Sequence, residues 1–267
     1  ISIHLKDNDL VILRSTVEVG TTAYLDKKIF NKTGKSYEIA FCPERTIEGK
    51  AMVELRQLPQ IIGSESINTS SRVSQFFSFM TPTVVRVSTR ETAELIKLID
   101  NSQRDVSFAL SNEIAEISDA YSISAHEVIS SGKLGYPRTN LPLPGPVGGP
   151  CLSKDPHILS QCFEECQFSL DITKAARLTN ESVPDFVTDS IYSYFLKLGL
   201  LDPQSSISKI SVLGLAFKGR PETNDLRGST SLLFIESLKS KFPSSTIFAH
   251  DPMVSKDQIH GIDITYT

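Results

Sequence analysis

Cysteine is scarce in this chain, as are several other features that would mark a specialised class of protein. Four cysteines in 267 residues, at positions 42, 151, 162 and 166, are too few and too irregular for a disulfide framework. No apolar run approaches the roughly 18 residues of a membrane span, and the first residues show neither an initiator Met nor a signal-peptide pattern. With a net charge of -4, nothing indicates binding to nucleic acid or to an anionic membrane.

Two of the cysteines could suggest a metal site, but their surroundings argue against it. Cys162 and Cys166 lie four residues apart on a predicted helix, without Cys or His partners at zinc spacing. We therefore predict no metal site. The composition, 40% hydrophobic and 22% charged, is typical of a soluble globular protein, and the length suggests about two domains of roughly 100–200 residues each.

The first part of the chain alternates short apolar runs with helical patterns. Residues 10–13, 39–42 and 60–63 are typical of buried parallel strands; a helical pattern at 22–30 follows the first strand, and another at 70–79 follows the third. This order predicts a doubly wound, Rossmann-like sheet. No Gly-x-Gly-x-x-Gly fingerprint is present. We therefore expect the dinucleotide-binding turn to be absent or upstream, and the chain to be a fragment.

Two polar segments follow strands in this part. The hydroxyl-rich turn 15–22 lies just past the first strand and opens a helix, which is where open α/β sheets bind ligands. Glu44 and Glu48 follow the second strand, four residues apart. They would either share one face of a helix or line one loop.

A long helix is predicted to follow a short strand at 83–87. Ser88 and Glu91 form a capping box, and no Pro or Gly interrupts the helical pattern before about residue 121. A helix of this length is expected to bridge two domains and to pack against a copy of itself. Lys97 and Asn101 share one of its faces, and a solvated polar face is the alternative to a functional role.

A Gly- and Pro-rich loop, residues 135–150, leads into the stretch Gly-Gly-Pro-Cys-Leu-Ser-Lys-Asp that begins at Gly148. A long ordered loop is usually functional. If Cys151 opens a helix, Lys154 and Asp155 lie on the same side of its first turn, which would suit a covalent nucleophile. The alternative is a buried cysteine beside a Gly-Pro turn.

Helical patterns are predicted on both sides of this loop, and a second α/β segment follows them. The helices cover 124–131, 156–166 and 170–198, the last with Pro184 near its middle. Gly199 and Pro203 mark a boundary.

Beyond that boundary, residues 210–213 and 246–249 are predicted strands, with a helix at 230–241 between them. Lys218 and Arg227 fall between the first strand and this helix, a favourable place for phosphate. We predict domains at 1–80, 81–200 and 201–267.

Five motifs in the same order and spacing resemble the UDP-glucose/GDP-mannose dehydrogenase family of nucleotide-sugar 6-dehydrogenases. They are Ser15–Thr22, Cys42–Ala51, Ala93–Asn101, Gly148–Asp155 and Gly214–Arg227. The chain departs from the family pattern at Glu18, where the family has proline, and at Ser64, where it often has glycine.

The resemblance implies an NAD-dependent enzyme of the cytoplasm that oxidises the C6 alcohol of a UDP-sugar to a uronate through a cysteine thioester. It also implies a homodimer or higher homo-oligomer and a role in polysaccharide biosynthesis. It assigns catalysis to Cys151, Lys97, Asn101, Asp155, Glu44, Glu48 and Thr16, cofactor contacts to Thr16, Glu48, Lys154 and Arg227, and substrate contacts to Glu44, Lys97, Asn101, Arg138, Gly148, Phe217 and Lys218.

Other functions remain open at this point. The motifs around Cys42 and Cys151 resemble the N-acetylhexosamine branch of the family more than the UDP-glucose branch. An inactive scaffold that dimerises through the long helix is a second possibility. The 3-hydroxyacyl and 6-phosphogluconate type dehydrogenases share the layout but lack a nucleophilic cysteine after Gly-Gly, so Cys151 argues against them.

Overall fold

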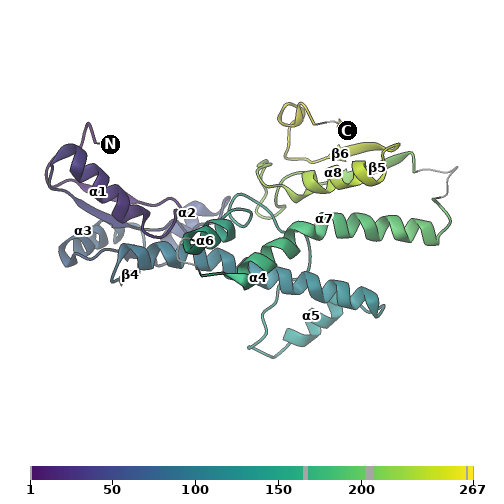
Figure 1. The fold of residues 1–267 in the computed structure, drawn as a ribbon, viewed down its shortest axis with the longest axis horizontal. Coiled ribbons are helices and arrows are strands. Elements are labelled where there is room, and N and C mark those ends of the chain that lie inside the picture. The colour runs from purple at the N-terminus through teal and green to yellow at the C-terminus, as the bar shows by residue number, and fades with distance from the viewer. Residues whose placement is uncertain (1, 165–167, 202–206, 263, 267) are drawn as a thin grey trace. The chain divides into compact units, whose positions relative to one another are not determined.

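The computed structural model describes residues 2–164, 168–201, 207–262 and 264–266 (Figure 1). Two residues that entered the predictions, Cys166 and Pro203, lie outside this described part. In chain order the elements are β1 (Leu10–Leu13), α1 (Thr21–Thr33), β2 (Glu38–Phe41), α2 (Ala51–Gln57), β3 (Gln60–Gly63), α3 (Ile67–Phe77), β4 (Val84–Val87), α4 (Arg90–Ala120), α5 (Ala125–Lys133), α6 (Asp155–Glu164), α7 (Asp171–Lys197), β5 (Lys209–Leu213), α8 (Thr230–Lys241), β6 (Thr246–His250), the 3-10 helix η1 (Lys256–Ile259) and β7 (Thr265–Tyr266).

The chain forms two compact units. The first comprises Ile1–Ser102 and Asp155–Leu170, and the second comprises Gln103–Lys154 and Asp171–Thr267. The division falls inside α4 and again between Lys154 and Asp155. These units show where the chain is compact and do not test the predicted domains. The division into domains at 1–80, 81–200 and 201–267 therefore stays a prediction.

The first unit contains a four-stranded sheet in the order β1-β2-β3-β4. The pairs β1–β2 and β3–β4 are parallel, with α1 and α3 as their connections, as predicted. The middle pair, β2–β3, is antiparallel and joins at Phe41 and Gly63, which differs from the expected all-parallel sheet. The connection between β2 and β3 therefore does not have to cross the sheet face, and the short helix α2, which the sequence did not predict, lies within it.

One cluster of buried side chains in this unit lies between the sheet and α3, and a second, Phe41, Ile61 and Ala93, lies where the sheet meets α4. Ala40 and Ile62 on the strands are fully buried, and Val73 and Phe77 on α3 pack against them. Burying such side chains stabilises the fold by about 1.5–3 kcal/mol each. The edge of the sheet that carries the polar turns is therefore anchored to this packed core.

The long helix α4 has 31 residues, close to the predicted length. It begins at Arg90, two residues later than predicted, because Thr89 caps it: the Thr92 N–H donates to Thr89 Oγ1 at 3.0 Å. Ser124 caps α5 in the same way, through the N–H of Glu127 at 3.2 Å. Although α4 and α7 are long, no helix of the described residues is apolar enough over such a length to cross a membrane.

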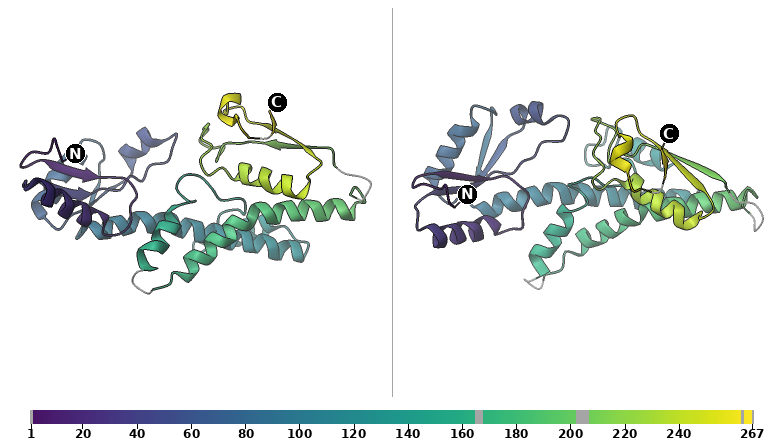
Figure 2. Two further views of the ribbon diagram at one scale, coloured as in Figure 1. Left: turned by 45° about the horizontal axis from the view of Figure 1, so that its top comes forward. Right: turned by 90° about the horizontal axis from the view of Figure 1, so that it is seen from above.

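The second unit contains a parallel sheet in the order β5-β6-β7. Helix α8 lies between this sheet and α7 (Figures 1 and 2). Ile235 and Leu238 on α8 are almost completely buried in the core there. The opposite face of α8 is tied to α7 by an ion pair of 2.6 Å between Lys241 and Asp189. Both ends of the loop from β5 to α8 are therefore anchored in packed elements, the sheet at one end and α8 at the other.

Candidate functional site

In the first unit, helices α4 and α6 bring together three of the predicted catalytic residues. Asp155 begins α6 and is completely buried, and Asn101 on α4 donates to its Oδ2 atom at 2.5 Å. Lys97 is half-buried one turn earlier on α4, on the face of Asn101. Because Asn101 is buried, the alternative of a solvated polar face is wrong for this residue. The N-terminus of α6 also favours the negative charge of Asp155.

The polar turn after β1 is held in place by a buried carboxylate. Glu94 of α4 is 1% exposed. It accepts hydrogen bonds from the N–H groups of Gly20 and Thr22, at 2.6 and 2.8 Å, and from the Thr22 hydroxyl at 2.5 Å. The N–H groups at the N-terminus of α1 are therefore already bonded to Glu94. Thr16 lies in the same polar turn and is half-buried. The prediction assigned its hydroxyl to catalysis and cofactor binding.

Glu44 and Glu48 lie in the segment between β2 and α2, so they line one loop rather than a helix face. Glu44 accepts from Arg14 at 2.5 Å and from the N–H groups of Arg45 and Thr46 at 2.9 Å each. Burial opposes its charge, but the bonds from Thr46 and the ion pair with Arg14 outweigh burial and lower the pKa of Glu44. Glu44 is therefore ionised and oriented, whereas Glu48 is exposed.

In the second unit, Cys151 lies in a turn that spans residues 151–154, and α6 begins only at Asp155. The idea that Cys151 opens the helix is therefore wrong. The turn is closed by Ser153, whose hydroxyl donates to the Gly149 carbonyl at 2.7 Å. Cys151 is exposed, so the alternative of a buried cysteine is also wrong, and Lys154 is exposed beside it in the chain.

The other described cysteines have different surroundings. Cys42 is completely buried, and burial raises the pKa of its thiol to about 12. Burial also raises the pKa of Cys162, whose sulfur accepts from the Val19 N–H at 3.4 Å. Cys151 is the exposed one of these three and is therefore the most accessible to an electrophile.

Three glycines allow the loop that carries Cys151 to cross the β5–α8 loop in close contact. A Cβ atom on Gly148 would lie 2.2 Å from the Gly228 carbonyl oxygen, and one on Gly149 would lie 2.5 Å from the Phe217 ring. Gly149 also has φ +91°, and its N–H donates to the Gly228 carbonyl at 2.8 Å. Within this unit, Gly148 and Phe217, two of the predicted substrate contacts, therefore lie where the Cys151 loop meets the β5–α8 loop, and Lys218 follows Phe217 in the chain.

Charges gather on the β5–α8 loop itself. The Lys218 ammonium lies 5.0 Å from the centre of the Phe217 ring. Asp225 accepts from the Arg227 guanidinium at 2.6 Å, and this bond lowers the pKa of Asp225. The Arg227 side chain is 75% exposed. The loop thus holds a fixed cation at Lys218 and a braced, solvent-facing one at Arg227.

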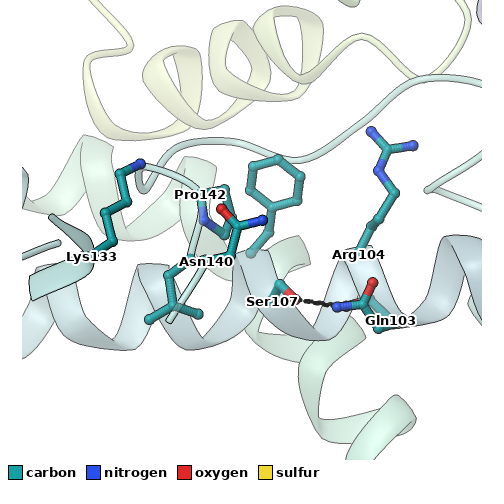
Figure 3. Close-up of a pocket in the computed structure, with 8 residues that line it drawn as sticks. Gln103, Arg104, Ser107, Lys133, Asn140 and Pro142 are labelled. Atoms are coloured by element: carbon teal, nitrogen blue, oxygen red, sulfur yellow. Dashed lines mark hydrogen bonds between the residues drawn. The ribbon is translucent and has the colours of Figure 1, made fainter. Parts of the chain in front are cut away.

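A pocket of about 320 Å³ in the second unit was not predicted from the sequence (Figure 3). It is lined by Gln103, Arg104, Ser107, Phe108, Lys133, Asn140, Leu141 and Pro142. Arg104 and Lys133 extend toward the same side of α4 (Figure 3), and no lining residue is a carboxylate. One aromatic ring, two amides and two cations suit an anionic ligand with a planar ring. Only the spacing of Gln103, Arg104 and Ser107 on one helix face could have indicated this pocket.

The remaining predicted residue, Arg138, is exposed in the loop after α5. Its guanidinium stacks on the Tyr136 ring at 4.4 Å, and its Nε atom donates to the Tyr136 hydroxyl at 3.0 Å. Within the described ranges, no group of three or more His, Cys, Asp or Glu side chains could hold a metal ion.

The fold and the two groups of side chains define an α/β protein of the dinucleotide-binding type with an exposed cysteine beside a cationic loop. Residues 1–81 match the family model of the UDP-glucose/GDP-mannose dehydrogenase family, NAD binding domain, and residues 91–182 match the central domain of the same family. The chain belongs to the UDP-glucose/GDP-mannose dehydrogenase family. The predicted family and fold class are confirmed, and so is NAD as the family's cofactor.

Several relatives carry a more specific name. The chain is 32% identical over 252 residues to a UDP-N-acetyl-D-mannosamine dehydrogenase of Methanococcus maripaludis, covering 94% of this chain and 55% of the relative. It is 36% identical over 242 residues to one of Yersinia pestis, covering 85% and 56%. The solved UDP-D-ManNAc dehydrogenase of Pyrococcus horikoshii superposes with a TM-score of 0.86 at 30% identity, over 95% of this chain and 59% of that chain. The chain spans about half the length of the curated relatives it matches.

The residues of the first unit fit part of an NAD molecule. In dinucleotide-binding folds the diphosphate lies on a Gly-x-Gly-x-x-Gly turn, and no such turn occurs in these 267 residues. The N-terminus of α1 is occupied by Glu94. The polar turn at residues 15–19, at the carboxyl end of β1, is the part of this unit left to contact NAD. Its hydroxyls suit hydrogen bonds to parts of the cofactor other than the diphosphate.

Proposed function

We propose that the complete protein containing this chain oxidises the C6 alcohol of a UDP-sugar to the uronate in two NAD-dependent steps, with a UDP-N-acetylhexosamine as the substrate. The supporting observation is the packing of the Cys151 loop on Phe217 and Gly228 of the β5–α8 loop, which also carries Lys218, together with the exposure of the Cys151 thiol. The names of the most similar relatives support the N-acetylhexosamine branch. We further propose that the protein works in the cytoplasm as a homo-oligomer.

In the first oxidation, Lys97 and Asn101 stabilise the alkoxide that forms at C6. A preorganised cation and an amide donor favour a developing oxyanion more in a partly buried site than in water. Asp155, which is buried and bonded to Asn101, accepts the proton of the alcohol directly or through a water molecule. When bound, NAD accepts the hydride from C6 in each of the two oxidations.

In the second oxidation, Cys151 acts as the nucleophile. Its thiolate attacks C6 of the aldehyde and forms a C–S bond, and the carbonyl oxygen takes a proton to give a thiohemiacetal. Loss of a hydride from C6 and of the hydroxyl proton leaves a thioester. Water then attacks the thioester carbon, the C–S bond breaks, and Cys151 is regenerated as the uronate leaves.

The loop between β2 and α2 serves the hydrolysis of this thioester. Glu44, fixed by Arg14 and two N–H groups, orients the water molecule through its carboxylate. Its lowered pKa makes it a weak base, so we assign proton removal to Glu48, with the Thr16 hydroxyl as a further partner for the water. Thr16 and Glu48 also contact the cofactor, together with Lys154 and Arg227.

The nucleotide part of the substrate is bound in the second unit. Phe217 and Gly148 hold the sugar end, and Lys218 pairs with a phosphate. The pocket lined by Arg104 and Lys133 takes the nucleotide, with the two cations near the diphosphate. Arg138 reaches the substrate from its exposed loop, within its own subunit or in a neighbouring one.

A substrate panel on the complete protein tests the proposal. UDP-N-acetylmannosamine, UDP-N-acetylglucosamine and UDP-glucose are each supplied with NAD, and NADH and uronate are measured together. We expect two NADH per uronate and the highest kcat/KM for a UDP-N-acetylhexosamine. A higher kcat/KM for UDP-glucose would instead assign the protein to the UDP-glucose branch of the family. No turnover with any of the sugars would favour the inactive scaffold.

A further inference from the structure

Arg177 of α7 holds the main chain on both sides of Cys151. Its side chain is 4% exposed. The Nη1 atom donates to the Leu152 carbonyl at 2.8 Å and the Nη2 atom to the Val147 carbonyl at 3.4 Å. Nη1 also donates to Asp105 Oδ1 on α4 at 2.6 Å, and Asp105 is 1% exposed. One buried guanidinium thus bridges α4 and the two ends of the segment that carries the thiol.

The same two helices hold the loop farther upstream. Asn180 donates to the Asp105 carboxylate at 2.9 Å and accepts from Asn112 at 3.0 Å. Asn112 in turn accepts from the Gly145 N–H at 2.8 Å. We call Asp105, Asn112, Arg177 and Asn180 the α4–α7 polar seam. It fixes the loop at Gly145, Val147 and Leu152.

A seam of this kind is poorly explained by stability alone. An ion pair as deeply buried as Arg177 with Asp105 loses most of its Coulomb gain to desolvation, and well-packed apolar side chains stabilise such a position as well or better. What apolar side chains would lack is the planar fork of donors that binds two main-chain carbonyls and a carboxylate at set angles. The benefit of Arg177 is therefore the conformation of the Cys151 loop.

We propose that Arg177, oriented by Asp105, is a positioning residue that sets the geometry of the Cys151 thiol for attack on the substrate. This proposal rests on the proposed function, because it assigns Cys151 as the nucleophile. Arg177 touches neither substrate nor cofactor, and acts through the carbonyls of Val147 and Leu152. Misplacing a reacting atom by about 1 Å can lower a rate by about 100-fold. Loss of the fork should therefore lower kcat far more than it raises KM.

The test compares Arg177→Lys and Asp105→Asn with Val183→Ala, in the complete protein. Arg177→Lys keeps the charge but loses the fork, and Asp105→Asn keeps the size but replaces the carboxylate of the ion pair with a neutral amide, which binds the guanidinium more weakly. Val183 is buried on the same helix α7 and its side chain has no polar group, so Val183→Ala provides a matched loss of stability without touching the loop contacts. Circular dichroism at the assay temperature shows which variants are folded.

Two readouts are taken from each folded variant. The first is kcat and KM for uronate formation. The second is the pH profile of Cys151 alkylation by iodoacetamide in the folded protein, quantified by mass spectrometry on the Cys151 peptide after digestion. For Arg177→Lys and Asp105→Asn we expect kcat to fall by about 10- to 100-fold with KM within about threefold, and a displaced alkylation profile. Val183→Ala should match wild type in both readouts.

Three results would overturn the proposal. In the first, a folded seam variant has the kcat and the alkylation profile of wild type. In the second, Val183→Ala loses as much kcat as the seam variants, and in the third, a seam variant changes KM alone. If Arg177→Lys does not fold, Asp105→Asn decides alone. Should both fail to fold while Val183→Ala folds, the seam is structural and the proposal is wrong. Failure of the proposed function is distinct, because the wild-type protein would then make no uronate while the alkylation profiles would still be measurable.

Discussion

Several loops that carry site residues are fixed by buried or half-buried carboxylates that accept hydrogen bonds from main-chain N–H groups. Glu94 holds the turn after β1, Glu44 holds its own loop, and Asp251 accepts from the N–H groups of Leu215 and Ala216 at 2.7 and 2.9 Å. Burial opposes the charge of Asp251, but these donors outweigh it and lower its pKa. Glu44 and Asp251, whose pKa values are both lowered, therefore keep their charge at neutral pH and act as fixed acceptors.

Glu94→Gln should destabilise the first unit. The amide would place an NH₂ group against the donors of Gly20 and Thr22, leaving at least one buried partner unsatisfied, which costs about 1–3 kcal/mol. Urea unfolding measures the change in free energy. Glu113→Gln, at an exposed position of the same helix, is the control and should lie within about 0.5 kcal/mol of wild type. Equal stability of the two variants would contradict the role given to Glu94.

Thiol reactivity should separate the described cysteines. Iodoacetamide at neutral pH should label exposed Cys151 first, Cys162 slowly and Cys42 not at all in the folded protein, because burial raises the pKa of Cys42 to about 12. Mass spectrometry of digested samples over time gives the three rates, and labelling in urea is the control for access. Labelling of Cys42 as fast as Cys151 under native conditions would refute this order.

At the scale of elements, strong local signals were sufficient for many boundaries. The helix predicted at 230–241 is α8 as found, and uninterrupted apolar spacing predicted α4 to within two residues at its start. Helix α2 was missed because its seven residues carry no side-chain cap and only a weak pattern. The antiparallel pairing of β2 and β3 was missed because strand patterns do not record direction, which depends on how the connection folds.

Helix α4 should form an interface between two copies of the protein. Leu110 and Ile117, seven residues apart and 46% and 58% exposed, lie on one stripe of α4. Sedimentation of the complete protein at micromolar concentration should show a dimer or larger oligomer. Leu110→Glu with Ile117→Glu should shift it toward the monomer, whereas Asp119→Asn, exposed on the other side of the same helix, should not. A wild-type monomer, or an oligomer unaffected by the double change, would contradict the interface.

At the scale of the whole molecule, the candidate residues within each unit come from segments far apart in the sequence. Motif order was enough to nominate Cys151, Asn101 and Asp155, because each stands in a short stretch that resembles a family motif. The partners that hold these stretches could not be predicted in the same way. Arg177 meets Asp105 across 72 residues, and Gly148 meets Gly228 across 80, with no local pattern to link them. Such pairs depend on packing, which no periodicity encodes.

The most direct test of the central claim is the amount of NADH released per active site in a single turnover by Cys151→Ser, with uronate assayed in parallel. A serine hydroxyl is far less acidic than a thiol, and its ester is a poorer route to hydrolysis than a thioester. In the proposed mechanism the first oxidation depends on Lys97, Asn101 and Asp155 and needs no sulfur. We therefore predict at most one NADH per sugar and either no uronate or a stalled adduct. Uronate at a near wild-type rate, with two NADH for each sugar, would show that Cys151 is not the nucleophile.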